Sequence, residues 1–214
     1  MIEIFAAVYP IYLLILLILF NTHLLVLKMI ETARLRLRQW RAEDYTAFAA
    51  MGSNPQVMEY FPKLLTRAES DAMIDQMKSI IDRQGWGFWA VELKHNQQFI
   101  GFTGLHDQPT QFSFSPCVEI GWRLDQAYWG QGYAPEAAQA ALAFAFDQLK
   151  LDKVVAFTTV DNAKSQKVMQ KLNMKCVTQF QHPALAQDHP LSWHVLYEIL
   201  QKDFIHYTGC YSFI

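Results

Sequence analysis

The residues best suited to chemistry in this chain lie between positions 118 and 149. Gly130 and Gly132 come shortly before Pro135, a residue that suits the first position of a helix. The two glycines allow a tight turn and a close approach of a ligand to the main chain. Because the first N–H groups of a helix are unpaired and favour an anion, the turn predicts a phosphate-binding site. Glu119, just before it, is a carboxylate that could accept a proton.

A strand and a helix must hold these groups in place. Before the turn, apolar and polar residues alternate, which predicts a strand with one buried face. Glu119 and Arg123 lie on its polar face, and the apolar set is Val118, Ile120, Trp122 and Leu124. From Pro135 to Phe146 the apolar residues follow helical spacing, and alanine, the strongest helix former, is frequent.

This strand, turn and helix resemble motif A of the GCN5-related N-acetyltransferase (GNAT) superfamily. The motif reads Gln or Arg, two residues, Gly, one residue, then Gly or Ala. Gly132 and Ala134 match the small positions, whereas Trp129 stands where the family usually has Gln or Arg. An aromatic-Trp-Gly-x-Gly-Tyr-Ala run of this kind is similar to the RimJ/RimL branch, the ribosomal-protein alanine acetyltransferases. The resemblance extends from about Met29 to about Phe204.

The resemblance implies an α+β fold, in which about four helices flank a central, mostly antiparallel twisted sheet with a splayed pair of strands. It also implies an N-acetyltransferase with acetyl-CoA as co-substrate and no metal. In the family, the turn binds the pyrophosphate through N–H groups, and the splayed strand binds the pantetheine arm through its main chain. The corresponding cofactor-binding residues here are Gln131, Gly132, Tyr133 and Ala134 in the turn, and Ile120, Trp122 and Leu124 in the strand.

A second stretch, residues 159–169, resembles motif B of the family. By that resemblance, Asn162 would bind the cofactor arm or the end of the strand. Ser165 would lie near the sulfur as a catalytic residue and donate a hydrogen bond to the leaving thiolate. The alternative is structural, since Asn162 also suits the N-cap of the following helix.

Glu119 is the candidate general base, which would take the ammonium proton directly or through water. The alternative is a structural glutamate paired with a neighbour. Arg123 lies on the same strand face but about 13 Å along the chain. That partner is therefore out of easy reach, although an adjacent strand could still supply one.

The acceptor side of the cleft is less well defined by the sequence. In the family the loop that contains Tyr60 and Phe61 lines this side, so both are weak candidates for substrate contact, together with Trp86. The alternative is that these rings cap the core. The branch resemblance implies direct attack, in a ternary complex, by the N-terminal amine of a protein such as a ribosomal protein. A small amine or an amino sugar is the other acceptor to consider.

Composition and spacing exclude several classes of function. The 214 residues fit one domain, and a net charge of −2 without a Lys/Arg run argues against direct nucleic-acid binding. Three distant cysteines without ligand spacing predict neither a metal site nor a disulfide framework. A dinucleotide-binding fold is disfavoured because Pro135 occupies the third glycine position, and no Gly-Lys-Ser/Thr occurs for a P-loop.

The ends of the chain are treated separately from the domain of residues 29–205. Residues 1–28 are apolar between Glu3 and Lys28, long enough for a transmembrane anchor, yet Met29 could equally be the true start. With an anchor, the arginines that follow predict a cytoplasmic domain, and a membrane-tethered, non-catalytic acyl-CoA sensor is an alternative function. Without one, the protein is expected in the cytoplasm. No structure is predicted for the tail 206–214, and monomer and homodimer both stay open.

The remaining pattern predicts the other elements of the domain. A first strand is expected over Arg34–Trp40 with Leu35 and Leu37 inward, and Asp44 could cap the helix after it. The further expected elements are a helix over Arg67–Arg83, strands over Phe88–Leu93 and Phe99–Leu105, a strand over Lys153–Val160, a helix over Lys164–Leu172, ended by Asn173, and a final strand pair over Met174–Phe180 and Trp193–Ile199.

Overall fold

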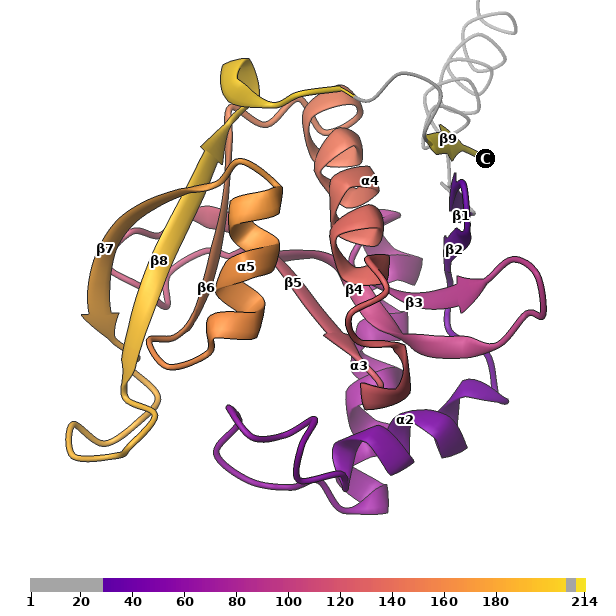
Figure 1. Ribbon diagram of the computed structural model, residues 1–214, viewed down its shortest axis with the longest axis horizontal. Coiled ribbons are helices and arrows are strands. Elements are labelled where there is room, and N and C mark those ends of the chain that lie inside the picture. Colours follow the sequence, from indigo (N-terminus) through magenta and orange to yellow (C-terminus); the bar gives the residue numbers. More distant parts are fainter. Residues whose placement is uncertain (1–28, 207–210) are drawn as a thin grey trace, which may run out of the picture.

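A computed structural model describes residues 29–206 and 211–214, which form one mixed sheet flanked by helices (Figure 1). The strand order of the sheet is β7-β8-β6-β5-β4-β3-β2-β1-β9. The strands are β1 (Met29–Thr32), β2 (Leu35–Arg38), β3 (Phe88–Leu93), β4 (Phe99–Gln108), β5 (Cys117–Leu124), β6 (Lys153–Thr159), β7 (Lys175–Gln181), β8 (Trp193–Leu200) and β9 (Tyr211–Phe213). The helices are α2 (Asp44–Gly52), α3 (Arg67–Gln84), α4 (Tyr133–Asp147) and α5 (Ala163–Lys171).

The pair β5 and β6 differs from every other neighbouring pair in the sheet. All the other pairs are antiparallel, whereas β5 and β6 are parallel and are joined by α4. Their pairing is confined to Glu119 and Val155, after which the two strands run apart (Figure 1). The predicted splayed pair is confirmed, and from Ile120 onward the edge of β5 that faces β6 has no strand partner.

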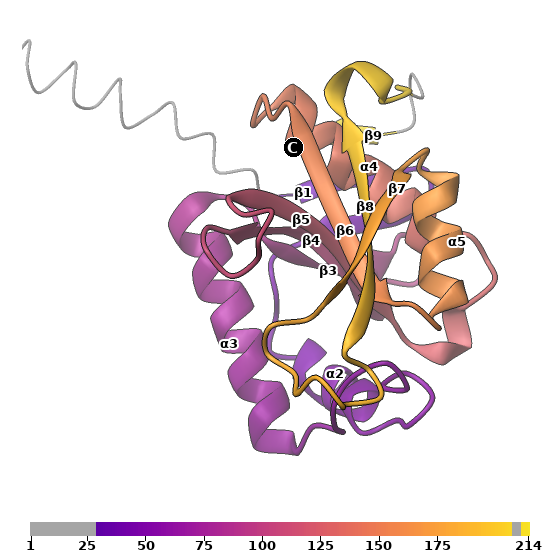
Figure 2. The same cartoon turned by 90° about the vertical axis from the view of Figure 1, so that its left-hand side faces the viewer.

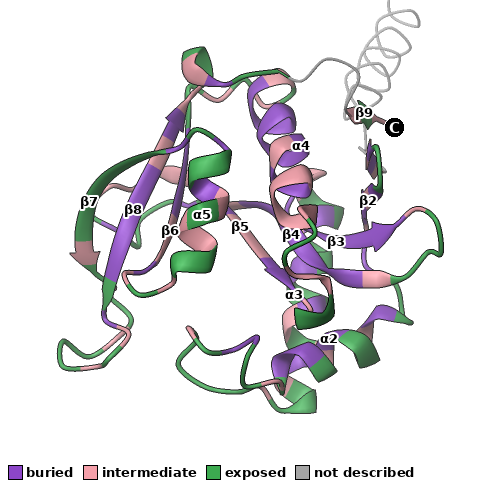
Figure 3. Cartoon of the chain, viewed as in Figure 1, coloured by how far each residue is buried: buried purple, intermediate pink, exposed green. Residues whose placement is uncertain are grey.

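Helices cover both faces of the sheet, with α4 and α5 on one face and α3 on the other (Figure 2). The helix α4 packs against β1, β4, β5 and β6, and its alanines at 137, 138, 140, 141, 143 and 145 are almost fully buried. Such small side chains allow the helix axis to approach the sheet closely. In contrast, β7 is exposed along most of its length (Figure 3).

Most predicted elements are confirmed, with differences at their ends. The strand expected over Arg34–Trp40 is β2, which spans only Leu35–Arg38, and an unpredicted strand, β1, precedes it. Leu35 and Leu37 are fully buried as predicted. Asn173 has a φ of 60°, the left-handed conformation expected at the end of α5. Residues 211–213, in the tail for which no structure is predicted, form β9 and pair with β1. Residues 1–28 lie outside the described part of the chain.

Asp44 has a different role from the predicted helix cap. The helix α2 begins at this residue, and the carboxylate is buried against the guanidinium of Arg38, with N–O distances of 2.7 and 2.9 Å. Glu92 accepts from Nε of Arg38 at 2.6 Å, so the buried cation has two carboxylate partners. The network ties β2, β3 and α2 together, and the two carboxylates offset the cost of burying the guanidinium.

In residues 29–206 and 211–214, no helix is long and apolar enough to cross a membrane. No group of three or more His, Cys, Asp and Glu side chains in the same ranges is arranged to hold a metal ion.

We expect Asp44→Ala to lower the free energy of unfolding by about 3 kcal/mol, because it leaves the buried Arg38 with one partner fewer. Asp71→Ala is the control, since the pair of Asp71 with Arg67 is exposed and contributes little. Urea denaturation followed by circular dichroism measures both variants. Equal losses of stability in the two variants would show that the network is not a structural anchor.

Candidate active site

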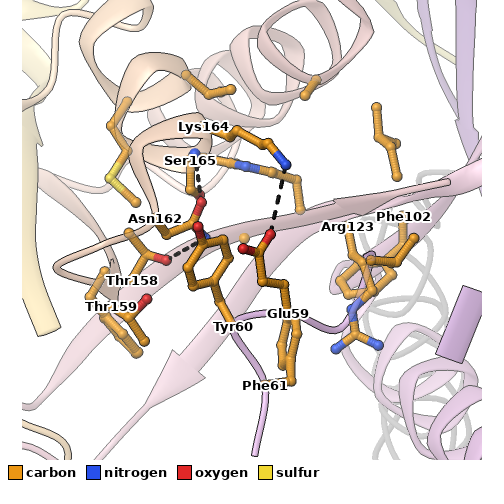
Figure 4. Close-up of a pocket in the computed structure, with 18 of the residues that line it drawn as sticks. Glu59, Tyr60, Phe61, Phe102, Arg123, Thr158, Thr159, Asn162, Lys164 and Ser165 are labelled. Atoms are coloured by element: carbon orange, nitrogen blue, oxygen red, sulfur yellow. Dashed lines mark hydrogen bonds and ion pairs between the residues drawn. The ribbon is translucent and has the colours of Figure 1, made fainter. Parts of the chain in front are cut away.

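A cavity of about 870 Å³ lies where β5 and β6 diverge, at the upper end of the usual size for ligand pockets. Its wall combines parts of the chain that are far apart in sequence. The main ones are the loop 56–62, β5 from Glu119 onward, the turn 128–135, the end of β6, α5, and the segment 182–194, with single residues from α3, β3 and β4. Figure 4 shows side chains from several of these segments around the same space.

The glycine turn has the geometry that an anion site requires. Gly130 and Gly132 have φ values of +77° and +81°, which L-residues adopt at a cost, and Gly132 is the N-cap of α4. The N–H groups of Gln131, Gly132, Tyr133 and Ala134 donate to no acceptor among the described residues. Gly132, Tyr133 and Ala134 line the cavity, and Gln131 is exposed beside it.

Arg34, between β1 and β2, holds this turn from outside. Its Nε is 2.6 Å from Glu136 in the first turn of α4, and its Nη1 donates to the carbonyl of Gln131 at 3.0 Å. The guanidinium also lies 4.4 Å from the ring centroid of Tyr133. The ion pair places a carboxylate near the positive end of α4, where it stabilises the helix.

Trp129, the departure from the usual motif, joins the turn to its surroundings. Its indole N–H donates to the carbonyl of Leu124, the last residue of β5, at 2.9 Å. The ammonium of Lys164 lies 4.4 Å from the Trp129 ring centroid and 3.8 Å from Glu59 in the loop 56–62 (Figure 4). Trp129 thus connects the end of β5 with the start of α5.

The two faces of β5 serve different purposes. Ile120 and Leu124 are buried, and Trp122 packs against the core, so these predicted cofactor residues could contribute to a ligand mainly through their main chain. Glu119 and Arg123 lie on the other face, where Arg123 contacts Phe61 of the loop 56–62, and both line the cavity.

Glu119 has partners on the adjacent strand β4. Its Oε2 accepts a hydrogen bond from Nε2 of Gln108 at 2.9 Å, and Nδ1 of His106 is 3.9 Å from the same oxygen. The other oxygen, Oε1, accepts nothing from the described residues and lies next to Gly121, which has no side chain to cover it. One carboxylate oxygen is therefore fixed and the other is available, so the structural and catalytic interpretations coexist.

The motif B residues form the N-terminus of α5. Asn162 is the N-cap, with its Oδ1 accepting from the N–H of Ser165 at 3.1 Å and its Nδ2 donating to Thr158 at 2.9 Å (Figure 4). The capping alternative is thus realised, and it occupies both ends of the Asn162 amide. The Ser165 hydroxyl lines the cavity and bonds to no other described residue.

The three aromatic candidates for substrate contact separate into two groups. Tyr60 and Phe61 line the cavity, and burial raises the pKa of the Tyr60 hydroxyl, with a further contribution from Glu59. Trp86 packs against the core and is not part of the cavity wall.

Two histidines of the cavity wall, His182 and His194, are not predicted from the sequence. Their ring centroids are 4.9 Å apart, and burial lowers the pKa of both imidazoles. Nδ1 of His194 lies 3.2 Å from the carbonyl of Ser192, which can only accept, so Nε2 is the free acceptor nitrogen. No local signal marks His194, because only its register opposite Thr159 of β6 brings it to the cavity.

Comparison with known proteins gives a consistent result. The family model described as an acetyltransferase (GNAT) domain matches residues 34–175. The uncharacterized protein YkkB of Bacillus subtilis is 30% identical over 144 residues, covering 67% of this chain and 83% of the relative. The uncharacterized N-acetyltransferase YnaD of the same organism is 29% identical over 147 residues, covering 68% and 82%.

Among solved structures, a GNAT-family acetyltransferase from Bacillus anthracis superimposes with a TM-score of 0.69 and 25% identity. The match covers 81% of this chain and 99% of that one. This chain therefore belongs to the GNAT acetyltransferase family.

Proposed function

We propose that the chain moves the acetyl group of acetyl-CoA to a primary amine by direct attack within a ternary complex. One observation carries the proposal: the gap between β5 and β6 opens onto a cavity that holds both the free N–H groups of the glycine turn and the carboxylate of Glu119. A strand edge, an anion site and a proton acceptor thus meet in one place.

The residues present fit acetyl-CoA, which when bound would supply the acetyl group as an activated thioester. The N–H groups of residues 131–134 would hold the pyrophosphate, because they are unpaired and lie at the start of α4. The unpaired edge of β5 from Ile120 to Leu124 would hold the pantetheine arm through main-chain hydrogen bonds. Asn162 would support that arm by fixing the start of α5.

Glu119 is proposed as the general base. Its Oε1 is available beside Gly121, while Gln108 fixes the other oxygen and so orients the carboxylate. A carboxylate held in this way could take the proton of the ammonium group directly or through a water molecule. His194 is the competing base, since its neutral imidazole presents Nε2.

Ser165 is proposed to meet the leaving sulfur. Its hydroxyl lies on the cavity wall at the first turn of α5, and its own N–H is already used in the cap with Asn162. The hydroxyl has no hydrogen-bond partner among the described residues and can donate to the sulfur. The N-terminus of α5 also favours a negative charge nearby.

The proposed acceptor is the α-amino group of a protein N-terminus, such as that of a ribosomal protein. The aromatic-Trp-Gly-x-Gly-Tyr-Ala run around Trp129 supports this branch. A small amine or an amino sugar is the second candidate. An acceptor screen that follows free thiol release from acetyl-CoA, with peptides and small amines side by side, tests both.

We expect Glu119→Gln to lower kcat about 10²- to 10⁴-fold, the usual contribution of a general base, with the Kd for acetyl-CoA unchanged. Thiol release gives kcat, and calorimetry gives the Kd. Glu43→Gln, at an exposed residue before α2, is the matched control and should retain full activity. Normal activity of Glu119→Gln together with a large loss in His194→Gln would transfer the role of base to His194.

Gly132→Ala should weaken acetyl-CoA binding at least about tenfold, since an added methyl group keeps the phosphate from the N–H groups that would bond it. Gly85→Ala is the matched control, because Gly85 has nearly the same φ, +83°, but ends α3 away from the cavity. Both variants should lose about 1–2 kcal/mol of stability from left-handed strain. Equal acetyl-CoA affinities in the two variants would contradict a phosphate site at the turn.

A further inference from the structure

Arg123 is a buried cation without an ion-pair partner. The residue is 7% exposed, and its Nε and Nη1 atoms are buried without a hydrogen-bond acceptor. No carboxylate of the described residues forms an ion pair with it. Burial lowers the pKa of Arg123 to about 10, so the guanidinium still carries its charge at neutral pH. A buried charge without a partner costs several kcal/mol, and its retention calls for an explanation.

Two aromatic rings surround the guanidinium and do not remove this cost. Its central carbon lies 4.0 Å from the ring centroid of Phe61 and 5.4 Å from that of Phe102 (Figure 4). Such contacts stabilise the charge through the ring faces, yet they provide no acceptor for the N–H groups in the plane of the guanidinium. The side chain is thus held in position with its donors unused.

The position of Arg123 is on the acceptor side of the cavity. It shares a face of β5 with Glu119, four residues earlier, at a Cα separation of about 13 Å. The glycine turn, in contrast, begins α4, which covers the opposite face of the sheet. Phe61, which lies over the guanidinium, is 38% exposed and belongs to the loop 56–62, so a modest side-chain movement would admit a ligand.

We propose that Arg123 binds an anionic group of the acceptor, most simply a carboxylate, and so selects amines that carry such a group at a distance from the reacting nitrogen. This inference rests on the proposed acetyl transfer and names its substrate class. The planar guanidinium suits a carboxylate because two parallel hydrogen bonds can form. Because Glu119 and Arg123 are four strand residues apart, the acceptor must be long enough to place its amine near Glu119 and its carboxylate near Arg123.

The test compares ω-amino carboxylates of increasing length, from glycine to 6-aminohexanoate, with amino alcohols of the same length. A peptide with aspartate as its second residue and its asparagine counterpart form a second arm, which tells a small acceptor from a polypeptide. We expect the carboxylates to have a KM about 10- to 100-fold below that of the alcohols, as for a lost charged hydrogen bond.

Arg123→Gln should abolish this difference while the Kd for acetyl-CoA stays unchanged, and Arg123→Lys should restore part of it. Arg83→Gln, at an exposed residue near the end of α3, is the control and should preserve the difference. A wild-type enzyme that acetylates carboxylates and alcohols equally well would overturn the inference and leave the acetyl transfer standing. Absence of thiol release with every amine, together with absence of acetyl-CoA binding, would overturn the proposed function itself.

Stability provides an independent measurement. Arg123→Met removes the unpaired charge and keeps a side chain of similar length, so we expect a higher Tm together with the loss of carboxylate selectivity. If Arg123 is only a structural partner of the two phenyl rings, the same variant lowers the Tm and leaves selectivity unchanged. A rise in the acetyl-CoA Kd of this variant would instead assign Arg123 to the cofactor, and would also overturn the inference.

Discussion

The divergence of β5 and β6 after a single pairing is the constraint on which the site depends. A parallel strand pair normally continues its ladder until one strand ends, which would leave no opening in the sheet. Here Glu119 and Val155 are the only paired positions, and the following residues of β5 keep an unpaired edge. That edge exposes main-chain donors and acceptors inside the protein, and buried groups of this kind require a partner. A ligand that runs along the strand would satisfy them.

The gap between the strands stays open because its two sides are fixed by different parts of the chain. On one side, the alanine-rich helix α4 packs closely against the sheet, and Arg34 anchors its first turn through Glu136. On the other side, α5 is capped by Asn162 and contacts the turn through Lys164 and Trp129. The glycine turn and the motif B helix are therefore held in one arrangement by contacts among the protein's own side chains.

Local patterns in the sequence were sufficient for most of the fold. Alternation located every strand except β1 and β9, helical spacing located α3 and α4, and Asn173 ended α5 because asparagine tolerates a left-handed conformation. The short strand β9 was not predicted, since three residues carry too little periodicity and its pairing with β1 is non-local. Asp44 was misplaced as a cap because its true partner, Arg38, is identified only when β2 and α2 meet.

The residues of the candidate site also fall into two groups, those that local sequence rules predict and those that only the pairing of strands brings together. The glycine turn and Asn162 follow local rules of backbone and capping, and the structure has them in the expected geometry. Which side chains share the cavity depends on the register between strands, and register is not visible in one sequence. His194 reaches the cavity through its pairing with Thr159, and Gln108 reaches Glu119 because both belong to the β4–β5 ladder. Trp86 is a predicted substrate contact that the structure does not bring to the cavity, because its ring packs against the core.

Arg38 and Arg123 show how the same degree of burial can serve structure or function. Both are almost inaccessible, at 3% and 7% exposure, and both come from strands of the same sheet. Arg38 is satisfied by Asp44 and Glu92, which is how a fold accommodates an internal cation. Arg123 lies against the rings of Phe61 and Phe102 and forms no ion pair with a described carboxylate. At Arg38, in contrast, the same sheet places two carboxylates beside a buried guanidinium. An internal charge left unpaired beside a cavity is more costly than an apolar residue of the same size. Its retention is therefore best explained by a partner that arrives with the substrate.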